Sequence, residues 1–166
     1  MQGAVRHLCV RLATYAMTII LMLPARSVTH AAESITASGL CTVAATPVAF
    51  GMYDPLLHRD GVTVGMLHYR CSGTPKRLTI GLTTGQSGSF RARKMRRGSA
   101  TILYNLYLDA AGTQVWGDGT RGSQTYVVNS SASGSEVSIP VYGRLFGDRN
   151  NAAGNYQDDV SVIVTY

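Results

Sequence analysis

Cysteine offers the clearest chemistry in this sequence. Cys41 and Cys71 lie in the body of the chain, and Cys9 lies near its start. The spacing is not the C-x-x-C of zinc or redox sites, and His58 and His68 are the only histidines beyond residue 31, so a metal pair or a redox pair has little support. In an oxidising compartment, Cys41 and Cys71 are most simply a disulfide bond, worth about 3–4 kcal/mol in the chain-entropy model.

Catalytic chemistry has less support. His58 lies between Asp54 and Asp60, but both aspartates begin ordinary turn dipeptides, one with Pro and one with Gly. Asp158 and Asp159 fall at the start of a predicted strand, where neighbouring side chains point to opposite faces. The sequence contains no nucleophile elbow, zinc motif or phosphate-binding loop. We therefore expect no enzyme, no catalytic residue, no metal site and no cofactor.

Two segments could bind a ligand. The loop containing Trp116 and Asp118 could stack a sugar or bind calcium, although a Trp-Gly-Asp-Gly run is more often a tight turn whose indole packs over a sheet. The run 91–97 holds five cations and could attract an anionic surface, although a solvated hairpin explains it more simply. Only Phe90 supplies a neighbouring aromatic ring, so we expect no nucleic-acid partner.

The start of the chain has the pattern of a secretory signal peptide. Arg6 and Arg11 precede a largely apolar stretch over 12–25, and no acidic residue occurs before Glu33. Small residues follow at the positions that precede a cleavage site. We therefore expect residues 1–31 to be a signal peptide that lies outside the fold.

Removing that segment also changes the charge. Without Arg6, Arg11 and Arg26 the 15 basic residues fall to 12, against 9 acidic ones. The resulting net charge of about +3 gives little support to nucleic-acid binding.

The rest of the chain alternates apolar and polar residues with a period of two. A helix over 95–109 is the main alternative, but Gly98 and Ser99 interrupt it, and its Ile-Leu-Tyr-Asn-Leu-Tyr run suits a strand better. The pattern predicts a single all-β domain, either a sandwich or a barrel, with turns rich in Gly, Ser and Asn. The clearest predicted strands are 66–71, 77–82, 102–108, 136–141 and 160–166.

The last predicted strand has an exposed apolar edge. Val160, Val162, Val164 and Tyr166 alternate along it, and no later strand follows in the sequence to pair with it. Such an edge is a template for pairing with another chain. We therefore expect these four residues to form an acceptor edge for a strand from elsewhere.

Several segments, taken in order, resemble the spore coat protein U domain family, the subunits of archaic chaperone–usher pili. The resemblance covers residues 41–166 and implies an immunoglobulin-like β-sandwich that lacks its last strand. The family's disulfide tethers the first strand to the second, which would correspond to Cys41 and Cys71. The matching segments include Cys41 to Pro55, Val62 to Cys71, Leu78 to Gly85, Arg93-Lys-Met-Arg-Arg97, Leu103-Tyr-Asn-Leu-Tyr-Leu-Asp109, Val115-Trp-Gly-Asp-Gly-Thr120, Pro140-Val-Tyr-Gly143, Gly154-Asn-Tyr-Gln-Asp158 and Val160 to Tyr166.

The resemblance also implies partners and a location. A periplasmic pilus chaperone would lend the missing strand, and the N-terminal extension of the next subunit would replace it at an outer-membrane usher. The chain would be exported to the periplasm and then displayed in a fimbria on the cell surface. Neighbouring pilus subunits are expected partners, and adhesion to a host or abiotic surface, or biofilm formation, is the expected role.

The candidate donor strand is the short extension 32–40. Ile35 and Ala37 are in phase along it with Gly39, and only Ile35 is large. Donor strands need large apolar anchors, because each buried Val, Leu or Ile contributes about 1.5–3 kcal/mol. The segment predicts a weak donor, and hence a tip or minor subunit.

Two alternatives stay open. A self-contained coat or surface protein of the same fold would supply its own last strand. A small sugar-binding tip adhesin would use Trp116 and nearby tyrosines.

Overall fold

The computed structural model describes residues 5–12, 41–54, 60–73, 75, 77–129, 134–147 and 151–165, and for residues 5–12 it describes the backbone. The described part of the chain holds no helix with the length and apolar character that crossing a membrane requires. A short 3-10 turn, η2, spans Gly85–Ser87. The strands are β1 (Val5–Leu12), β2 (Cys41–Ala45), β3 (Val48–Ala49), β4 (Gly61–Cys71), β5 (Arg77–Leu82), β6 (Arg93–Arg97), β7 (Ala100–Tyr107), β8 (Tyr126–Asn129), β9 (Glu136–Leu145) and β10 (Tyr156–Thr165).

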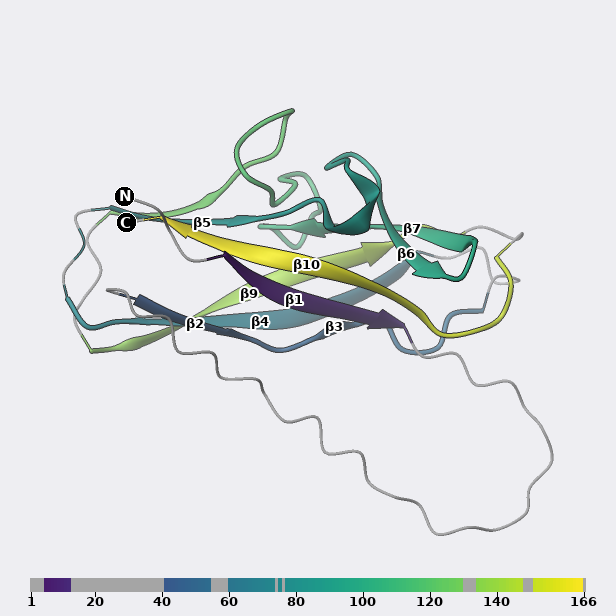
Figure 1. Ribbon diagram of the computed structural model, residues 1–166, viewed down its shortest axis with the longest axis horizontal. Helices are drawn as coiled ribbons and strands as arrows, with labels where there is room; N and C mark the ends of the chain where they lie inside the picture. The colour runs from purple at the N-terminus through teal and green to yellow at the C-terminus, as the bar shows by residue number, and fades with distance from the viewer. Residues whose placement is uncertain are drawn as a thin grey trace, which may run out of the picture.

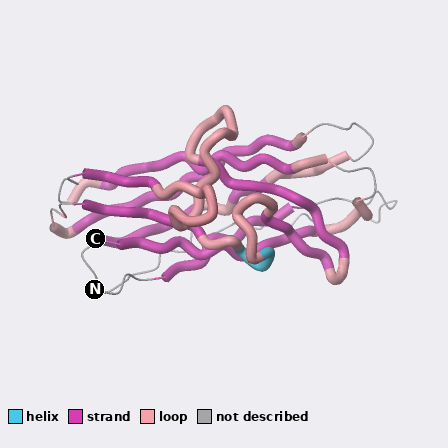
Figure 2. Tube along the Cα trace, turned by 90° about the horizontal axis from the view of Figure 1, so that it is seen from above, coloured by secondary structure: helices cyan, strands magenta, loops and turns pink. Residues whose placement is uncertain are grey.

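Strands pack in two layers, with β5 and β10 in one and β2 and β4 in the other (Figure 1). Hydrogen-bonded neighbours follow the order β8-β5-β10-β1-β3 from the first layer and β2-β4-β9-β7-β6 in the second, and β3 also contacts β4 of the second layer. A single pairing between Gln157 and Arg96 links β10 to β6 and joins the layers. Figure 2 shows the strands running along the long axis of the molecule. The all-β prediction is therefore confirmed.

The period-two pattern of the sequence corresponds to the inward and outward faces of the strands. In β10, for example, Tyr156, Val160 and Val162 are buried, whereas Gln157 and Asp159 between them are exposed. The helix considered over 95–109 does not form, because β6 and β7 make an antiparallel hairpin that turns between Arg97 and Ala100.

The strand order is immunoglobulin-like. In that fold one sheet has the order A-B-E-D and the other has the order C-F-G. Strands β2-β4-β9-β7 correspond to the first sheet, and β5 and β10 correspond to C and F. Strand β1, which runs antiparallel to β10, lies in the position of G, the last strand of such a domain.

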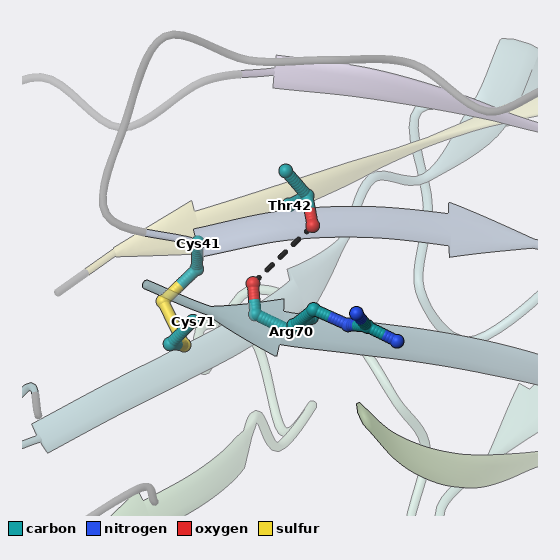
Figure 3. The surroundings of a disulfide bond; sticks show 4 residues. All are labelled: Cys41, Thr42, Arg70 and Cys71. Atoms are coloured by element: carbon teal, nitrogen blue, oxygen red, sulfur yellow. Dashed lines mark hydrogen bonds between the residues drawn. A yellow bond between two sulfur atoms is a disulfide. The ribbon is translucent and has the colours of Figure 1, made fainter. Parts of the chain in front are cut away.

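The disulfide prediction is confirmed. Cys41 and Cys71 pair in register across β2 and β4, and their sulfur atoms are 2.07 Å apart (Figure 3). Both residues are buried at one end of the core. In the same pair of strands the Thr42 hydroxyl donates a hydrogen bond to the Arg70 carbonyl at 3.3 Å. The disulfide therefore joins the first residue of β2 to the last residue of β4.

The start of the chain differs from the expectation. Residues 1–31 were expected to lie outside the fold, but Val5–Leu12 forms β1 in the full-length chain. The physical reason is that the outer edge of β10 carries backbone N–H and C=O groups that need partners. Removal of residues 1–31, and the boundaries of segments 32–40 and 41–166, stay predictions.

Candidate functional site: the outer edge of strand β10

The predicted acceptor residues lie on β10, in the core of the sandwich. Val160, Val162 and Val164 are 0%, 2% and 4% exposed, and they pack in one hydrophobic cluster with residues of both layers. Tyr166 lies outside the described residues, as do the candidate donor residues Ile35 and Ala37. The inward phase that the sequence predicts for the three valines agrees with their burial.

Strand β10 has a different partner on each edge. On its inner edge it pairs with β5 from Val162 to Thr165 and with β6 at Gln157. On its outer edge β1 pairs antiparallel with it at every position from Tyr156 to Ile163. Beyond β1, strand β3 pairs in parallel through Val48 and Ala49.

The outer edge of β10 therefore offers a slot for one strand, which β1 fills along eight residues of β10 and which β3 flanks at two positions (Figure 1). A slot of this kind binds any extended segment through backbone hydrogen bonds, and the side chains that face the core set its preference. Binding an extended strand is thus what this site can do chemically.

A buried carboxylate stands in the middle of the acceptor strand. Asp158 is fully buried, and its Oδ2 atom accepts a hydrogen bond from the Tyr104 hydroxyl at 2.7 Å. Its Oδ1 atom accepts from the backbone N–H groups of Gln86 and Asp159 at 2.9 and 3.0 Å. Burial raises the pKa of Asp158, and these hydrogen bonds offset part of the rise. Burial, together with the neighbouring carboxylate, also raises the pKa of Tyr104.

Glycine is required where η2 meets this carboxylate. Gly85 has φ +62°, and a Cβ built on it would collide with the carboxylate of Asp158. The turn therefore closes over Asp158 and places the N–H of Gln86 on it.

A second buried group, the guanidinium of Arg93, ties loops to the sheet beside Asp158. Its Nε and Nη2 atoms donate to the Thr83 carbonyl at 3.1 and 2.8 Å, and Nη2 also donates to the Trp116 carbonyl at 2.7 Å. Nη1 donates to Oδ1 of Asn105 at 2.7 Å, and the Asn105 amide donates to the Phe90 carbonyl at 2.7 Å. Burial lowers the pKa of Arg93 to about 10, so the group stays charged at neutral pH.

The cationic run 91–97 is thereby divided between the core and the surface. Arg93 points into the core with Met95, whereas Arg91, Lys94 and Arg96 are exposed. Only the outward residues of the hairpin could attract an anionic surface.

The loop at Trp116 forms the tight turn that its sequence favours, and not the sugar platform considered as the alternative. Trp116 is fully buried, its indole N–H donates to the Ile80 carbonyl at 2.9 Å, and its ring lies 6.1 Å from that of Tyr126. A sugar platform needs an exposed ring face, which Trp116 lacks. The residue belongs to the core of a tight turn, the alternative that its sequence also favours.

Asp118 also has a structural role in that turn. Its Oδ1 atom accepts hydrogen bonds from the backbone N–H and the hydroxyl of Thr120 at 2.8 and 2.6 Å. Burial tends to raise the pKa of Asp118, but these hydrogen bonds outweigh it and lower the pKa. Among the described residues no group of three or more His, Cys, Asp and Glu side chains could hold a metal ion.

The other residues considered for chemistry do not converge. Asp158 is buried and Asp159 exposed, so their carboxylates point to opposite faces of β10. Asp60 lies in an ion pair with Arg144, with 2.7 Å between Oδ2 and Nη2. His58 lies outside the described residues.

The buried polar cluster of Arg93, Tyr104, Asn105 and Asp158 was not anticipated from sequence. A signal was available for two of its members. Arg93 shares the inward phase of Met95, and Asp158 shares that of Val160, so each is a charge at a core position of its strand. Such positions call for a buried partner.

Comparisons with known proteins match nearly the whole chain. The Spore Coat Protein U domain family matches residues 27–163. Protein U of Myxococcus xanthus is 25% identical over 172 residues, which cover 92% of this chain and 94% of that protein.

Solved structures of fimbrial and adhesin proteins are also similar. An antigen and type I fimbria protein of Burkholderia pseudomallei superposes with a TM-score of 0.47 at 13% identity, over 99% of this chain and 98% of the other. The AfaE-3 adhesin of Escherichia coli superposes with a TM-score of 0.49 at 8% identity, over 99% and 97% of the two chains. The DaaE adhesin gives 0.48 at 11% identity, over 99% and 98%.

Proposed function

The chain belongs to the spore coat protein U domain family, and we propose that it is an exported structural subunit of an archaic chaperone–usher fimbria. Its sandwich would be completed by a strand from another chain. A periplasmic chaperone would lend that strand first, and the extension of a neighbouring subunit would replace it at an outer-membrane usher. The assembled fimbria would serve adhesion or biofilm formation at the cell surface.

The observation that carries this proposal is the origin of the strand beside β10. The G position is filled by Val5–Leu12, which lies inside the segment predicted to be a signal peptide. If that segment is removed on export, the outer edge of β10 from Tyr156 to Ile163 loses all eight of its pairings at once. An unpaired apolar edge invites a strand from another chain.

The chain's own extension would serve the next subunit. Residues 32–40 precede β2 and offer Ile35 and Ala37 in phase, with one large anchor. On that ground we keep the expectation of a weak donor.

An enzymatic role finds no support in the buried cluster. Each oxygen of Asp158 already accepts a hydrogen bond, and Arg93 donates to three different groups. These side chains hold strands and loops together, and they are closed to a substrate.

The experiment tests whether a peptide can supply the missing strand to the chain that remains after removal of residues 1–31. Residues 32–166 should aggregate when refolded alone, and should refold as a stable one-to-one complex with a peptide of residues 5–12 carrying Cys9→Ser. At a peptide concentration of 100 Kd the complex gains about 2.7 kcal/mol. The matched control is the same peptide with alternate backbone amides N-methylated, which keeps the side chains but removes ladder hydrogen bonds, and it should fail.

Variants on β10 give a second control. Val162→Asp places a charge in the core and should abolish completion, whereas Thr165→Asp, on the exposed face of the same strand, should not. A soluble, monodisperse monomer of residues 32–166, stable without any peptide, would overturn the proposal.

A self-contained surface protein is the second candidate, and the pairing of β1 with β10 favours it specifically. In that case the exported protein would keep residues 5–12 and complete its own sandwich. The N-terminal sequence of the exported protein decides between the two. A start after residue 12 requires a strand from elsewhere, and a start before residue 5 with a monomeric product identifies the self-contained protein.

A further inference from the structure

We propose that a groove on the outer face of β4 and β9 binds a neutral pyranose sugar. The groove has a volume of about 370 Å³ and is lined by Val62 and Val64 of β4, Tyr142 and Arg144 of β9, Tyr107 of β7, and the loop 109–112. It lies on the sheet opposite to that of β10. The inference therefore goes beyond the proposed strand assembly and does not depend on it.

The apolar part of the groove is unusually exposed for a sheet face. Val62 and Val64 are 78% and 55% exposed. Val64 pairs in register with Tyr142, and Tyr142 pairs with Tyr107, so a row of apolar and aromatic side chains crosses three strands. The C–H faces of a pyranose pack well on such a row, because each tyrosine presents an apolar ring with a polar hydroxyl at its end.

The polar part of the groove offers two hydrogen-bond donors. Asp60 holds Arg144 through two contacts to Oδ2, from Nε at 2.8 Å and Nη2 at 2.7 Å. The third nitrogen, Nη1, donates to no other described residue. The Tyr107 hydroxyl likewise has no hydrogen-bond partner among the described residues, and burial raises the pKa of Tyr107, so it stays protonated. Sugar hydroxyls accept from donors of this kind.

The loop 109–112, which forms one side of the groove, is stabilised by hydrogen bonds within its own turn. The Asp109 carboxylate accepts hydrogen bonds from Thr113 and from the backbone N–H of Gln114, at 2.7 Å for the latter. Gly112 has φ +70°, and a Cβ there would lie 3.8 Å from the Tyr107 ring and 3.9 Å from Nη1 of Arg144. Glycine therefore adds no side chain over these two groups, of which Arg144 is exposed and Tyr107 is 7% exposed.

Charge and size select the class of ligand. Asp60 and Asp109 contribute two negative charges to the lining against one positive charge from Arg144, which disfavours acidic sugars. The volume is at the small end of the range of about 300–1,000 Å³ for ligand pockets. A pocket that combines apolar walls with a few convergent polar groups is a binding site for a small neutral ligand, and one or two sugar rings fit this description.

The test is saturation-transfer NMR on the full chain with methyl glycosides of neutral hexoses and N-acetylhexosamines, with methyl glucuronide as the acidic counterpart. At least one neutral glycoside should bind, and Tyr142→Ala should weaken it at least about tenfold. Tyr142→Phe should retain most of the affinity, because it keeps the ring, and Tyr107→Phe should weaken binding severalfold. Val127→Ala is the matched control, since Val127 is 38% exposed on β8, in the other sheet.

Three results would overturn the inference: no neutral glycoside binds, only the glucuronide binds, or Tyr142→Ala has no greater effect than Val127→Ala. Retention of the Tyr142→Ala fold is checked by its thermal unfolding. None of these outcomes bears on completion of β10 by a peptide, so the two proposals fail separately.

Discussion

Replacing Tyr104 by Phe should destabilise the domain although almost no volume is removed. The lost hydroxyl donates to Oδ2 of Asp158 at 2.7 Å, and both residues are fully buried. The two remaining donors to Asp158 both bind Oδ1, so Oδ2 would have no partner among the described residues. A hydrogen bond to a charged group contributes about 1.5–3 kcal/mol, and a buried acceptor left unsatisfied adds to the loss. We expect a loss of about 2–3 kcal/mol.

Denaturant unfolding of the full chain at neutral pH measures this loss. The matched control is Tyr69→Phe, because Tyr69 is 3% exposed and its hydroxyl has no hydrogen-bond partner among the described residues. That control should change the free energy of unfolding by less than about 0.5 kcal/mol. By melting temperature, Tyr104→Phe should lower Tm by roughly 4–12 °C. Equal effects of the two substitutions would refute the reasoning, since they would mean that the hydrogen bond to Asp158 contributes nothing.

Two further predictions concern the same core. The pKa of Asp158 is raised in the fold, so the folded state holds the proton of this carboxyl more tightly than the unfolded state does. The unfolding free energy of the wild type, relative to that of Asp158→Asn, should therefore rise as the pH falls from 7 through the folded pKa. It should level off below about 3.9, the ordinary pKa of an aspartate. Unfolding titrations at stepped pH check this, and a relative free energy that falls on acidification would contradict it. The double substitution of Cys41 and Cys71 by Ser should lower stability by about 3–4 kcal/mol, because the disulfide closes a loop with a sequence separation of 30. The same denaturant assay measures it, and a loss below about 1 kcal/mol would be inconsistent with loop closure.

The strands could be predicted because their pattern is local. Residues 77–82 form β5 as expected, and the alternation of β10 from Val160 gives the correct inward face, since a strand exposes its two faces in turn. The disulfide could be predicted by counting cysteines. Each of these inferences needs only neighbouring residues or the composition of the chain.

The polar cluster could not be predicted, because its contacts are remote in sequence. Tyr104 meets Asp158 across 54 positions, and Gln86 meets it across 72. A charge in the inward phase shows that a partner is needed, but only the packing of β7 and η2 against β10 shows which one. For Trp116 the sequence favoured a packed turn residue but left a ligand platform open, because a tryptophan beside Gly and Asp has the same local sequence whether its ring is buried or exposed.

The buried cluster also explains how one strand can be both polar and an acceptor of apolar partners. Asp158 lies among Tyr156, Val160 and Val162 on the inward face of β10, so a strand added at the outer edge has to pass beside a carboxylate. An unpartnered carboxylate there would repel an apolar donor, because its desolvation would be uncompensated. Tyr104 and the turn at Gln86 bind both of its oxygens from within the same chain. The slot can therefore receive an apolar strand without leaving a buried charge unpaired.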